Sequence, residues 1–407
     1  AEEEAARQDV HGFHAYPARL HPLTARALVE GLSHLGDHVL DPFAGSGTVA
    51  VETVRAGRHA LGSDLNPVAV ALARLKATPT SASFRETLLA AAQQVWEFAE
   101  ERRLAKARPT IAYGTEDREL FSPHVLLELD GLRSGIESLL RDVPVRRAAL
   151  LVLSAVISKV STKRGDAAHG LTTKRHAGGF TLRFFVAKTR ELAERLAAFA
   201  AAVPPGTPAP QFWLQDARRL ESVPTGSVRL IVSSPPYPGV YDYHEHHAAR
   251  MRWLRMEGEP FLRGELGSRR QLQRLTFAEA IAEWERQFLP CLREMRRVLT
   301  PGGHAALILA DSTLGRRAVR AAELTSALAE RAGLSVALVA SQARPHFHLG
   351  SQDAFSQTPR REHLLILRAQ ERGPSPGVGR APARSGTDSA SHRHAGAPRR
   401  RVVTAKG

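Results

Sequence analysis

Residues 38–48 read His38-Val39-Leu40-Asp41-Pro42-Phe43-Ala44-Gly45-Ser46-Gly47-Thr48. The apolar start of this stretch predicts a short strand over 38–41, and residues 48–56 predict the helix behind a glycine turn. Gly45 and Gly47 permit positive φ and a close backbone approach, so a nucleoside or an amino-acid group can lie against the turn. The turn is not a P-loop, because no Lys-Ser or Lys-Thr pair follows the glycines.

A second strand, predicted over 59–63, runs into Gly62-Ser63-Asp64-Leu65-Asn66-Pro67, and a helix is predicted over 67–76. An acid at the end of the second strand, about 20 residues beyond the glycines, stands where nucleotide-binding folds bind a ribose diol. Asp64 is therefore a candidate for that role. The alternative is a tight turn with an Asp that caps the following helix.

The remaining chain predicts an α/β fold: a Rossmann-like sheet with helices on both faces, interrupted by a mostly helical insert. Long helical patterns fill residues 78–202, with a loop at 161–181, and a proline-rich joint follows at 203–210. Further strands are predicted over 211–214, 228–233, 304–310, 334–340 and 363–367, and helices over 277–299 and 316–331. We therefore divide the chain into a cofactor-binding part (1–77), an insert for nucleic-acid recognition (78–210), a catalytic part (211–370) and a disordered basic tail (371–407).

A second motif follows the strand predicted at 228–233 and reads Ile231-Val232-Ser233-Ser234-Pro235-Pro236-Tyr237. Two prolines fix the backbone and lack N–H donors, which leaves carbonyl acceptors beside the Ser234 hydroxyl and the Tyr237 ring. Such a site suits a planar ring that bears an amino group, because the acceptors take its N–H hydrogens while the tyrosine stacks on it. The alternative is a proline-rich surface turn with a half-buried tyrosine.

The net charge of +15 is concentrated in two segments. Residues 145–190 hold ten Lys and Arg against one acid, residues 371–407 hold eight against two, and the rest of the chain sums to zero. A focused basic patch is typical of proteins that bind polyanions. We expect phosphate contacts from the first segment, although a solvated loop is the alternative. The candidate residues are Lys159, Lys163, Arg164, Lys174 and Arg175.

Several classes of protein are excluded or disfavoured by the composition. The longest apolar stretch, residues 148–157, is too short for a membrane span, and the start of the sequence does not resemble a secretory signal. A single cysteine, Cys291, allows neither an internal disulfide nor a zinc site built from several cysteines. We therefore expect a cytoplasmic protein without membrane or metal. His244, His246 and His247 do not form a metal motif, and they predict the solvent-facing start of a helix.

The two motifs together, Asp-Pro-Phe-x-Gly-Ser-Gly-Thr and Ser-Pro-Pro-Tyr, resemble those of the amino-methylating DNA methyltransferases. That family methylates cytosine N4 or adenine N6 with S-adenosylmethionine. Residues 11–20 resemble its N-terminal motif, which encloses the methionine part of the cofactor, and residues 214–217 resemble its third-strand acid, which lies near the adenine. The resemblance covers about residues 11–77 and 211–368.

The resemblance implies roles for individual residues. Ser234 and the Pro235 carbonyl would accept hydrogen bonds from the target amine, beside Pro236, and Tyr237 would stack on the flipped base. Double-stranded DNA is the implied partner, together with a cognate restriction endonuclease, and serine at the first motif position favours cytosine N4. Contacts to S-adenosylmethionine would come from Tyr16, Pro17, Asp41, Phe43, Gly45, Gly47, Thr48, Asp64, Asn66 and Asp216.

Four alternatives stay open. The first is an adenine-N6 DNA methyltransferase. The second is a tRNA guanine-N2 methyltransferase, which usually has a separate N-terminal RNA-binding domain and Asp-Pro-Pro-Tyr, where this sequence has Ser-Pro-Pro-Tyr. The third is a non-catalytic DNA-binding module, which intact motif residues disfavour. The fourth is a small-molecule methyltransferase, which the focused basic patch disfavours.

Overall fold

The computed structural model describes residues 9–162, 175–344 and 349–369, and they belong to one compact unit. The predicted tail at 371–407 lies outside the described residues. The strands are β1 (His38–Asp41), β2 (His59–Asp64), β3 (Gln211–Leu214), β4 (Val228–Ser233), β5 (Leu299–Ala310), β6 (Ser312–Leu314), β7 (Arg317–Val319), β8 (Leu334–Ala343) and β9 (Arg361–Ala369).

The helices include one short 3-10 helix at the start, and they separate most of the strands. They are η1 (Asp9–Gly12), α2 (Pro22–Leu32), α3 (Thr48–Arg55), α4 (Pro67–Ala77), α5 (Ala82–Leu104), α6 (Thr115–Leu120), α7 (Pro123–Leu139), α8 (Val143–Val160), α9 (Phe180–Ala202), α10 (Tyr243–Leu254), α11 (Glu259–Gly264), α12 (Arg269–Leu272), α13 (Phe277–Val298), α14 (Ala321–Arg331) and α15 (Leu349–Ala354).

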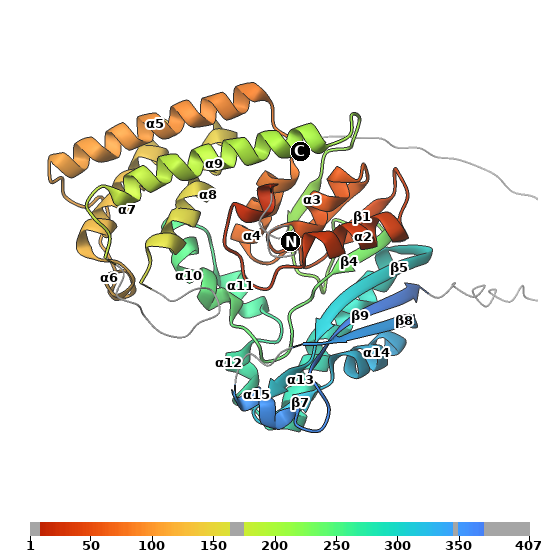
Figure 1. The fold of residues 1–407 in the computed structure, drawn as a ribbon. Helices are drawn as coiled ribbons and strands as arrows, with labels where there is room; N and C mark the ends of the chain where they lie inside the picture. Colours follow the sequence, from red (N-terminus) through yellow and green to blue (C-terminus); the bar gives the residue numbers. More distant parts are fainter. Residues whose placement is uncertain (1–8, 163–174, 345–348, 370–407) are drawn as a thin grey trace, which may run out of the picture. The chain divides into compact units, whose positions relative to one another are not determined.

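Seven strands of the described chain form one sheet in the order β3-β2-β1-β4-β5-β9-β8 (Figure 1). Strands β1 to β5 are parallel to their neighbours, whereas β9 is antiparallel to both β5 and β8. This is the Rossmann-like α/β sheet that the sequence predicted. The chain runs outward from β1 to β2 and β3 on one side and from β4 to β5 on the other. The carboxyl ends of β1 and β4 thus flank a topological switch point, the usual place for a ligand in an open α/β sheet.

The alternation of side chains along the central strands builds a core on each face of the sheet. Val39 and Leu230 lie in a buried cluster with residues of α2, on one face. Leu40 and Ile231, the next residues along β1 and β4, lie in a different cluster with residues of α13 and α14. Cys291 belongs to this second cluster and is buried, as the sequence predicted.

The predicted insert contains helices α5 to α9, which pack together beside the sheet (Figure 1). The apolar stretch at residues 148–157 lies inside α8, where nearly every side chain is buried against the other helices or against α4 and α10. Its apolar character is therefore explained by burial within the fold. Among the described residues, no helix combines the length and the hydropathy that crossing a membrane requires.

Two parts of the fold differ from the sequence prediction. The helix predicted over 316–331 begins only at Ala321, because residues 312–319 form the antiparallel pair β6 and β7. Three helices, α10 to α12, lie between β4 and α13. In this region the sequence predicted only the start of one helix near His244. Pro290 lies inside the long helix α13 without ending it. Helices α10 and α11 matter most here, because they contribute residues to the wall of the site.

Candidate active site

The glycine turn between β1 and α3 has the left-handed backbone that the sequence predicted. Gly45 and Gly47 have φ values of +49° and +82°. A Cβ on Gly47 would lie 2.7 Å from the Cα of Ala73 in α4, and a Cβ on Gly45 would lie 3.3 Å from Cε1 of Tyr16. Both positions therefore need glycine for the backbone conformation, and Gly47 also needs it because α4 packs directly on the turn.

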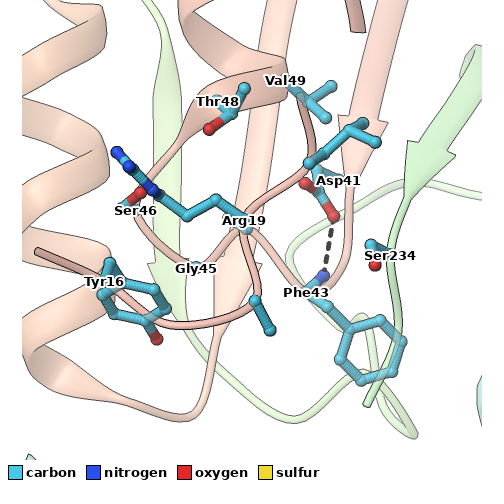
Figure 2. A pocket seen from close by; sticks show the side chains of 12 residues that line it. Tyr16, Arg19, Asp41, Phe43, Gly45, Ser46, Thr48, Val49 and Ser234 are labelled. Atoms are coloured by element: carbon cyan, nitrogen blue, oxygen red, sulfur yellow. Dashed lines mark hydrogen bonds between the residues drawn. The ribbon is translucent and has the colours of Figure 1, made fainter. Parts of the chain in front are cut away.

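Two carboxylates flank this turn, Asp41, which is buried, and Asp64, which is partly buried. Asp41 accepts hydrogen bonds through Oδ1 from the Ser233 hydroxyl at 2.6 Å. It also accepts from the Phe43 N–H at 3.0 Å, the bond drawn in Figure 2. Asp64 accepts from the Gly45 N–H at 2.8 Å through Oδ2 and from the Asn66 N–H at 2.8 Å through Oδ1.

Burial raises the pKa of Asp41 to about 7 and the pKa of Asp64 to about 6, and the charge of Asp64 raises the pKa of Asp41 further. A cation bound between the two acids would stabilise their ionised forms and would itself be stabilised.

Two cavities that share lining residues lie at the switch point. The smaller encloses about 310 Å³ of empty space and includes Asp41, Ser46 and Thr48 in its wall (Figure 2). The larger encloses about 640 Å³ and includes Asp64 and Pro236. The residues common to both walls are Tyr16, Ala18, Phe43, Gly45 and Ser234.

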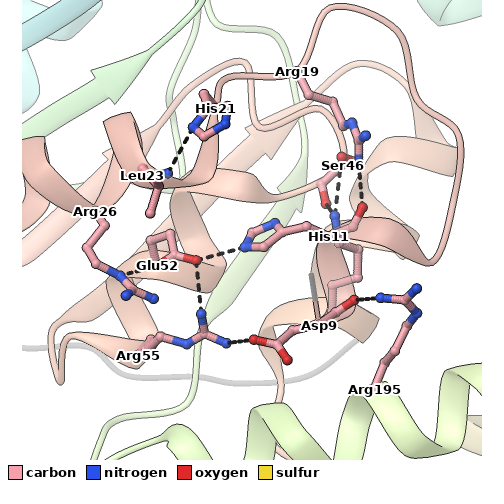
Figure 3. Close-up of polar contacts among 11 residues, drawn as sticks. Asp9, His11, Arg19, His21, Leu23, Arg26, Ser46, Glu52, Arg55 and Arg195 are labelled. Atoms are coloured by element: carbon pink, nitrogen blue, oxygen red, sulfur yellow. Dashed lines mark hydrogen bonds and ion pairs between the residues drawn. The ribbon is translucent and has the colours of Figure 1, made fainter. Parts of the chain in front are cut away.

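The N-terminal segment is held over the turn by a buried network around Glu52 of α3 (Figure 3). His11 Nε2 lies 2.7 Å from one carboxylate oxygen of Glu52, and Arg26 Nε donates to the other at 2.8 Å. Arg55 pairs with Asp9 at 2.7 Å. Burial lowers the pKa of His11 to about 4, so its imidazole is neutral at pH 7. This network fixes the segment that carries Tyr16 and Pro17.

Lys76 and Arg19 hold the same region from two sides. Lys76 of α4 is buried and donates through Nζ to the Ser46 carbonyl at 2.8 Å, beneath the turn. Arg19 lies in the wall of the smaller cavity and donates to the carbonyl of His11 (Figures 2 and 3). Neither cation was singled out from the sequence, because a lysine or arginine without a motif carries no local signal of burial.

Tyr16 is placed by contacts from two helices. Its hydroxyl accepts a hydrogen bond from Asn66 Nδ2 at 3.3 Å, and its ring centroid lies 4.7 Å from that of His247 in α10. His247 is 0% exposed, so the predicted solvent-facing position is wrong for this residue. The reason is that α10 packs on the N-terminal segment, where Arg250 also contacts the Ala15 carbonyl. Asn66 is buried and caps α4 through its bond to the Val68 N–H, outside both cavity walls.

Ser234 and Tyr237 contact each other at the end of β4. The two hydroxyl oxygens are 3.1 Å apart, and the Tyr237 hydroxyl donates to the Ile308 carbonyl of β5 at 3.4 Å. The Tyr237 ring packs against the core, and burial raises its pKa to about 12. Ser234 lies in both cavity walls and Pro236 in the larger one, whereas Pro235 and Tyr237 lie in neither. The predicted stacking of Tyr237 on a base therefore stays a prediction.

The other predicted site residues lie apart from the cavities. Both carboxylate oxygens of Asp216 accept hydrogen bonds from Arg218, at 2.5–2.9 Å, and Asp216 lines neither cavity. Lys159 and Arg175 are exposed. Lys163, Arg164 and Lys174 lie outside the described residues, so the predicted phosphate contacts stay a prediction.

Sequence reasoning missed the wall that α11 and the residues after it supply to the larger cavity. Phe261 and Glu265 come from this region, which carries no motif. Glu265 is buried, with its Oε1 accepting from the His244 N–H at 3.1 Å, and burial raises its pKa to about 7. In the sequence it is one acid among many, and only its packing distinguishes it.

Comparison with known proteins links the first part of the chain to one family. The profile of the N6_N4_Mtase family, described as DNA methylase, matches residues 2–75. The chain is 31% identical over 74 residues to Type II methyltransferase M.MjaII of Methanocaldococcus jannaschii. It is 34% identical over 76 residues to Type II methyltransferase M.MvaI of Kocuria varians. Each match covers 18% of this chain, and they cover 14% and 17% of those relatives respectively.

Among solved structures, TrmN from Thermus thermophilus aligns with 86% of this chain and 49% of its own, at 14% identity and a TM-score of 0.33. The assignment of the fold rests on the strand order and directions described above. Residues 2–75, which contain the glycine turn and both flanking acids, are thus similar to the DNA methylase family that the motifs indicated.

Proposed function

We propose that this chain is an S-adenosylmethionine-dependent methyltransferase that modifies an exocyclic amine in double-stranded DNA, with cytosine N4 as the target. One observation carries the proposal: the glycine turn, Asp41, Asp64 and Ser234 line two cavities at the switch point that share part of their walls. Binding groups for a cationic cofactor and an acceptor for an amine thus adjoin.

The cavities fit S-adenosylmethionine, which supplies an electrophilic methyl group on a positively charged sulfur. Gly45 lines both cavities without a side chain, so the cofactor can approach the turn there. Gly47 lines neither cavity and instead lets α4 pack on the turn. Asp64, at the end of β2, is suited to the ribose hydroxyls, since each of its oxygens has accepting capacity beyond the one backbone N–H it receives. Asp41, in the smaller cavity, is suited to the cationic methionine end.

The hydrogen bonds of Tyr237 support Ser234 as the acceptor for the amine. Because the Ile308 carbonyl can only accept, the Tyr237 hydroxyl donates its proton there. In the contact between the two hydroxyls, Ser234 must then be the donor. Its proton is directed at Tyr237, and its lone pairs are left for an N–H of the substrate. Tyr237 therefore acts as a positioning residue.

An amine attached to an aromatic ring is a weak nucleophile, because its lone pair is delocalised. Acceptance of its N–H hydrogens by Ser234 and by the Pro235 carbonyl would favour a tetrahedral nitrogen and stabilise the positive charge that develops on it. The nitrogen–carbon bond forms as the carbon–sulfur bond breaks, and the surplus proton of the amine leaves to solvent. No covalent bond to the chain is needed.

The choice of cytosine N4 rests on the serine in the first position of Ser-Pro-Pro-Tyr, and adenine N6 is the alternative. For the nucleic acid, the exposed Lys159 and Arg175 lie in the basic segment 145–190, which supports contact with phosphates. The family profile that matches residues 2–75 is described as DNA methylase, which supports a DNA substrate. A cognate restriction endonuclease stays a prediction.

A transfer assay with S-adenosylmethionine labelled in its methyl group tests this function. The purified chain is incubated with mixed-sequence duplex DNA or with total tRNA, and incorporated label is counted. We expect label in DNA and none in tRNA. Ser234→Ala is expected to lose the transfer while it still binds the cofactor. Label in tRNA alone would overturn the DNA assignment, and label in neither by a protein that binds the cofactor would favour a non-catalytic module.

A further inference from the structure

Glu265 lies in the wall of the larger cavity and has a buried carboxylate oxygen for which the described residues supply no hydrogen-bond partner. The residue follows α11, is 4% exposed and lies in the wall of that cavity. Its Oε1 accepts from the His244 N–H, whereas its Oε2 is buried and has no hydrogen-bond partner among the described residues. An unpaired carboxylate oxygen in such a place is costly, and native structures usually satisfy it. A ligand with an N–H donor would satisfy it here.

Glu265 lies on the same side of the larger cavity as Asp64, the residue proposed to bind the ribose. Gly264, its neighbour, sits so close to Leu65 that a Cβ on it would lie 2.7 Å from Leu65 Cδ1. Leu65 directly follows Asp64, and both lie in the wall that holds Glu265. The smaller cavity, with Asp41, does not include Glu265. The unpaired oxygen is thus on the side of Asp64, where the base attached to a bound ribose would extend.

The surroundings of Glu265 suit a flat heteroaromatic ring. Leu65, Phe261 and Leu266 contribute apolar side chains to the same wall. A ring held between such side chains would be oriented by the few polar groups at its edge, which is how small-molecule sites usually gain specificity. The one unpaired acceptor there would select a ring with an amino group.

Asp216, the acid expected near the adenine, is committed elsewhere. Arg218 donates to both of its oxygens, and the same guanidinium donates through Nη2 to the Gly264 carbonyl at 3.1 Å. Asp216 therefore fixes Arg218, and Arg218 supports the segment that carries Glu265. Glu265, which lines the larger cavity, lies on this segment.

We propose that Glu265 recognises the exocyclic amine of the cofactor's adenine, accepting its N–H through Oε2. This inference rests on the proposed use of S-adenosylmethionine. It gives the segment between α11 and α12 a role in discriminating a 6-amino purine from a 6-oxo purine, because a carboxylate would repel a carbonyl oxygen at that position.

Binding of two cofactor products by calorimetry at pH 8 tests the proposal. S-adenosylhomocysteine carries the 6-amino group, and S-inosylhomocysteine carries a 6-oxo group. Glu265→Gln keeps the shape and one carbonyl oxygen for the His244 N–H, and it turns an amide NH₂ toward the ligand. We expect this variant to bind S-adenosylhomocysteine about tenfold or more weakly and to bind S-inosylhomocysteine more tightly than the unmodified protein does.

Two control variants separate this effect from general damage. Glu257→Gln changes an exposed acid of the neighbouring loop and should leave both affinities unchanged. Asp216→Asn should weaken both ligands alike, without reversing the preference. Thermal melting identifies any variant that fails to fold, and Glu265→Asp, a shorter carboxylate, should then retain the preference for the 6-amino ligand.

The outcomes distinguish this inference from the proposed function. If the unmodified protein binds neither ligand, the proposed cofactor is wrong. If it binds S-adenosylhomocysteine and Glu265→Gln leaves the preference unchanged, the cofactor stands and the role of Glu265 is overturned. If Glu265→Gln loses transfer to DNA with unchanged cofactor affinity, Glu265 contacts the target base, which also overturns the assignment made here.

Discussion

Replacement of Asp41 by Asn should stabilise the protein without ligand and weaken its hold on the cofactor. Asp41 is buried at the end of β1, and its Oδ1 accepts both of its hydrogen bonds. An asparagine keeps an oxygen at that position, so the bonds from Ser233 and Phe43 survive. The substitution removes a carboxylate that is unfavourable to ionise because it is buried.

The magnitude follows from the pKa of Asp41, which burial raises from 3.8 to about 7. The folded protein keeps this proton up to a pH of about 7, whereas the unfolded chain releases it near 3.8. The contribution of Asp41 to stability is therefore lost as pH rises between these values. At pH 8 the penalty for ionised Asp41 is about 4 kcal/mol, and at pH 5 it is about 2 kcal/mol, on the order-of-magnitude scale of 1.36 kcal/mol per pH unit.

Thermal melting at pH 8 and at pH 5, with and without S-adenosylmethionine, is the assay. Asp41→Asn should melt several degrees higher than the unmodified protein at pH 8, and the difference should shrink by about half at pH 5. Added cofactor should raise the melting temperature of the unmodified protein more than that of the variant. A variant that melts lower at pH 8, or a difference that does not depend on pH, would refute the reasoning.

Three further substitutions test other parts of the site. Glu52→Ala should lower the free energy of unfolding, measured by urea denaturation, by about 3 kcal/mol or more, because it leaves His11, Arg26 and Arg55 without their buried partner. As a control, Glu257→Ala at an exposed position should change the free energy of unfolding little. Gly47→Ala should cost about 1–3 kcal/mol from the left-handed backbone alone, plus a clash with Ala73, and stability equal to that of the unmodified protein would contradict the close packing of α4 on the turn. Tyr237→Phe should lower kcat about fivefold or more and leave the affinity for S-adenosylmethionine unchanged, because Ser234 then loses the partner that orients its proton; a change in cofactor affinity instead would contradict this role.

The parts of the fold that the sequence predicted well are those with a strong local signal. The strand at 38–41, the glycine turn and the helix behind it follow from apolar residues, two glycines and Thr48. The prolines of Ser-Pro-Pro-Tyr likewise mark the end of β4. The order of the central strands then follows from the alternation of strands and helices and from the resemblance.

The parts that could not be predicted depend on contacts between residues far apart in the sequence. His247 is buried because α10 packs on Tyr16, more than 200 positions away, and nothing near His247 indicates this. Glu265 lines the cavity because its neighbour Gly264 packs on Leu65. Asp216 lies after β3, as expected, but both of its carboxylate oxygens accept hydrogen bonds from Arg218. The sequence around Asp216 does not indicate this pairing.

Methyl transfer to an amine of DNA is the central claim, and mass spectrometry of nucleosides tests it most directly. Genomic DNA and tRNA are isolated from one host that expresses the unmodified protein and from another that expresses Ser234→Ala, and both are digested to nucleosides. The account predicts N4-methylcytosine in DNA from the first host alone. N6-methyladenine in its place would keep the methyltransferase and overturn the choice of base. DNA without any methylated amine, beside a stable protein that binds S-adenosylmethionine, would contradict the account.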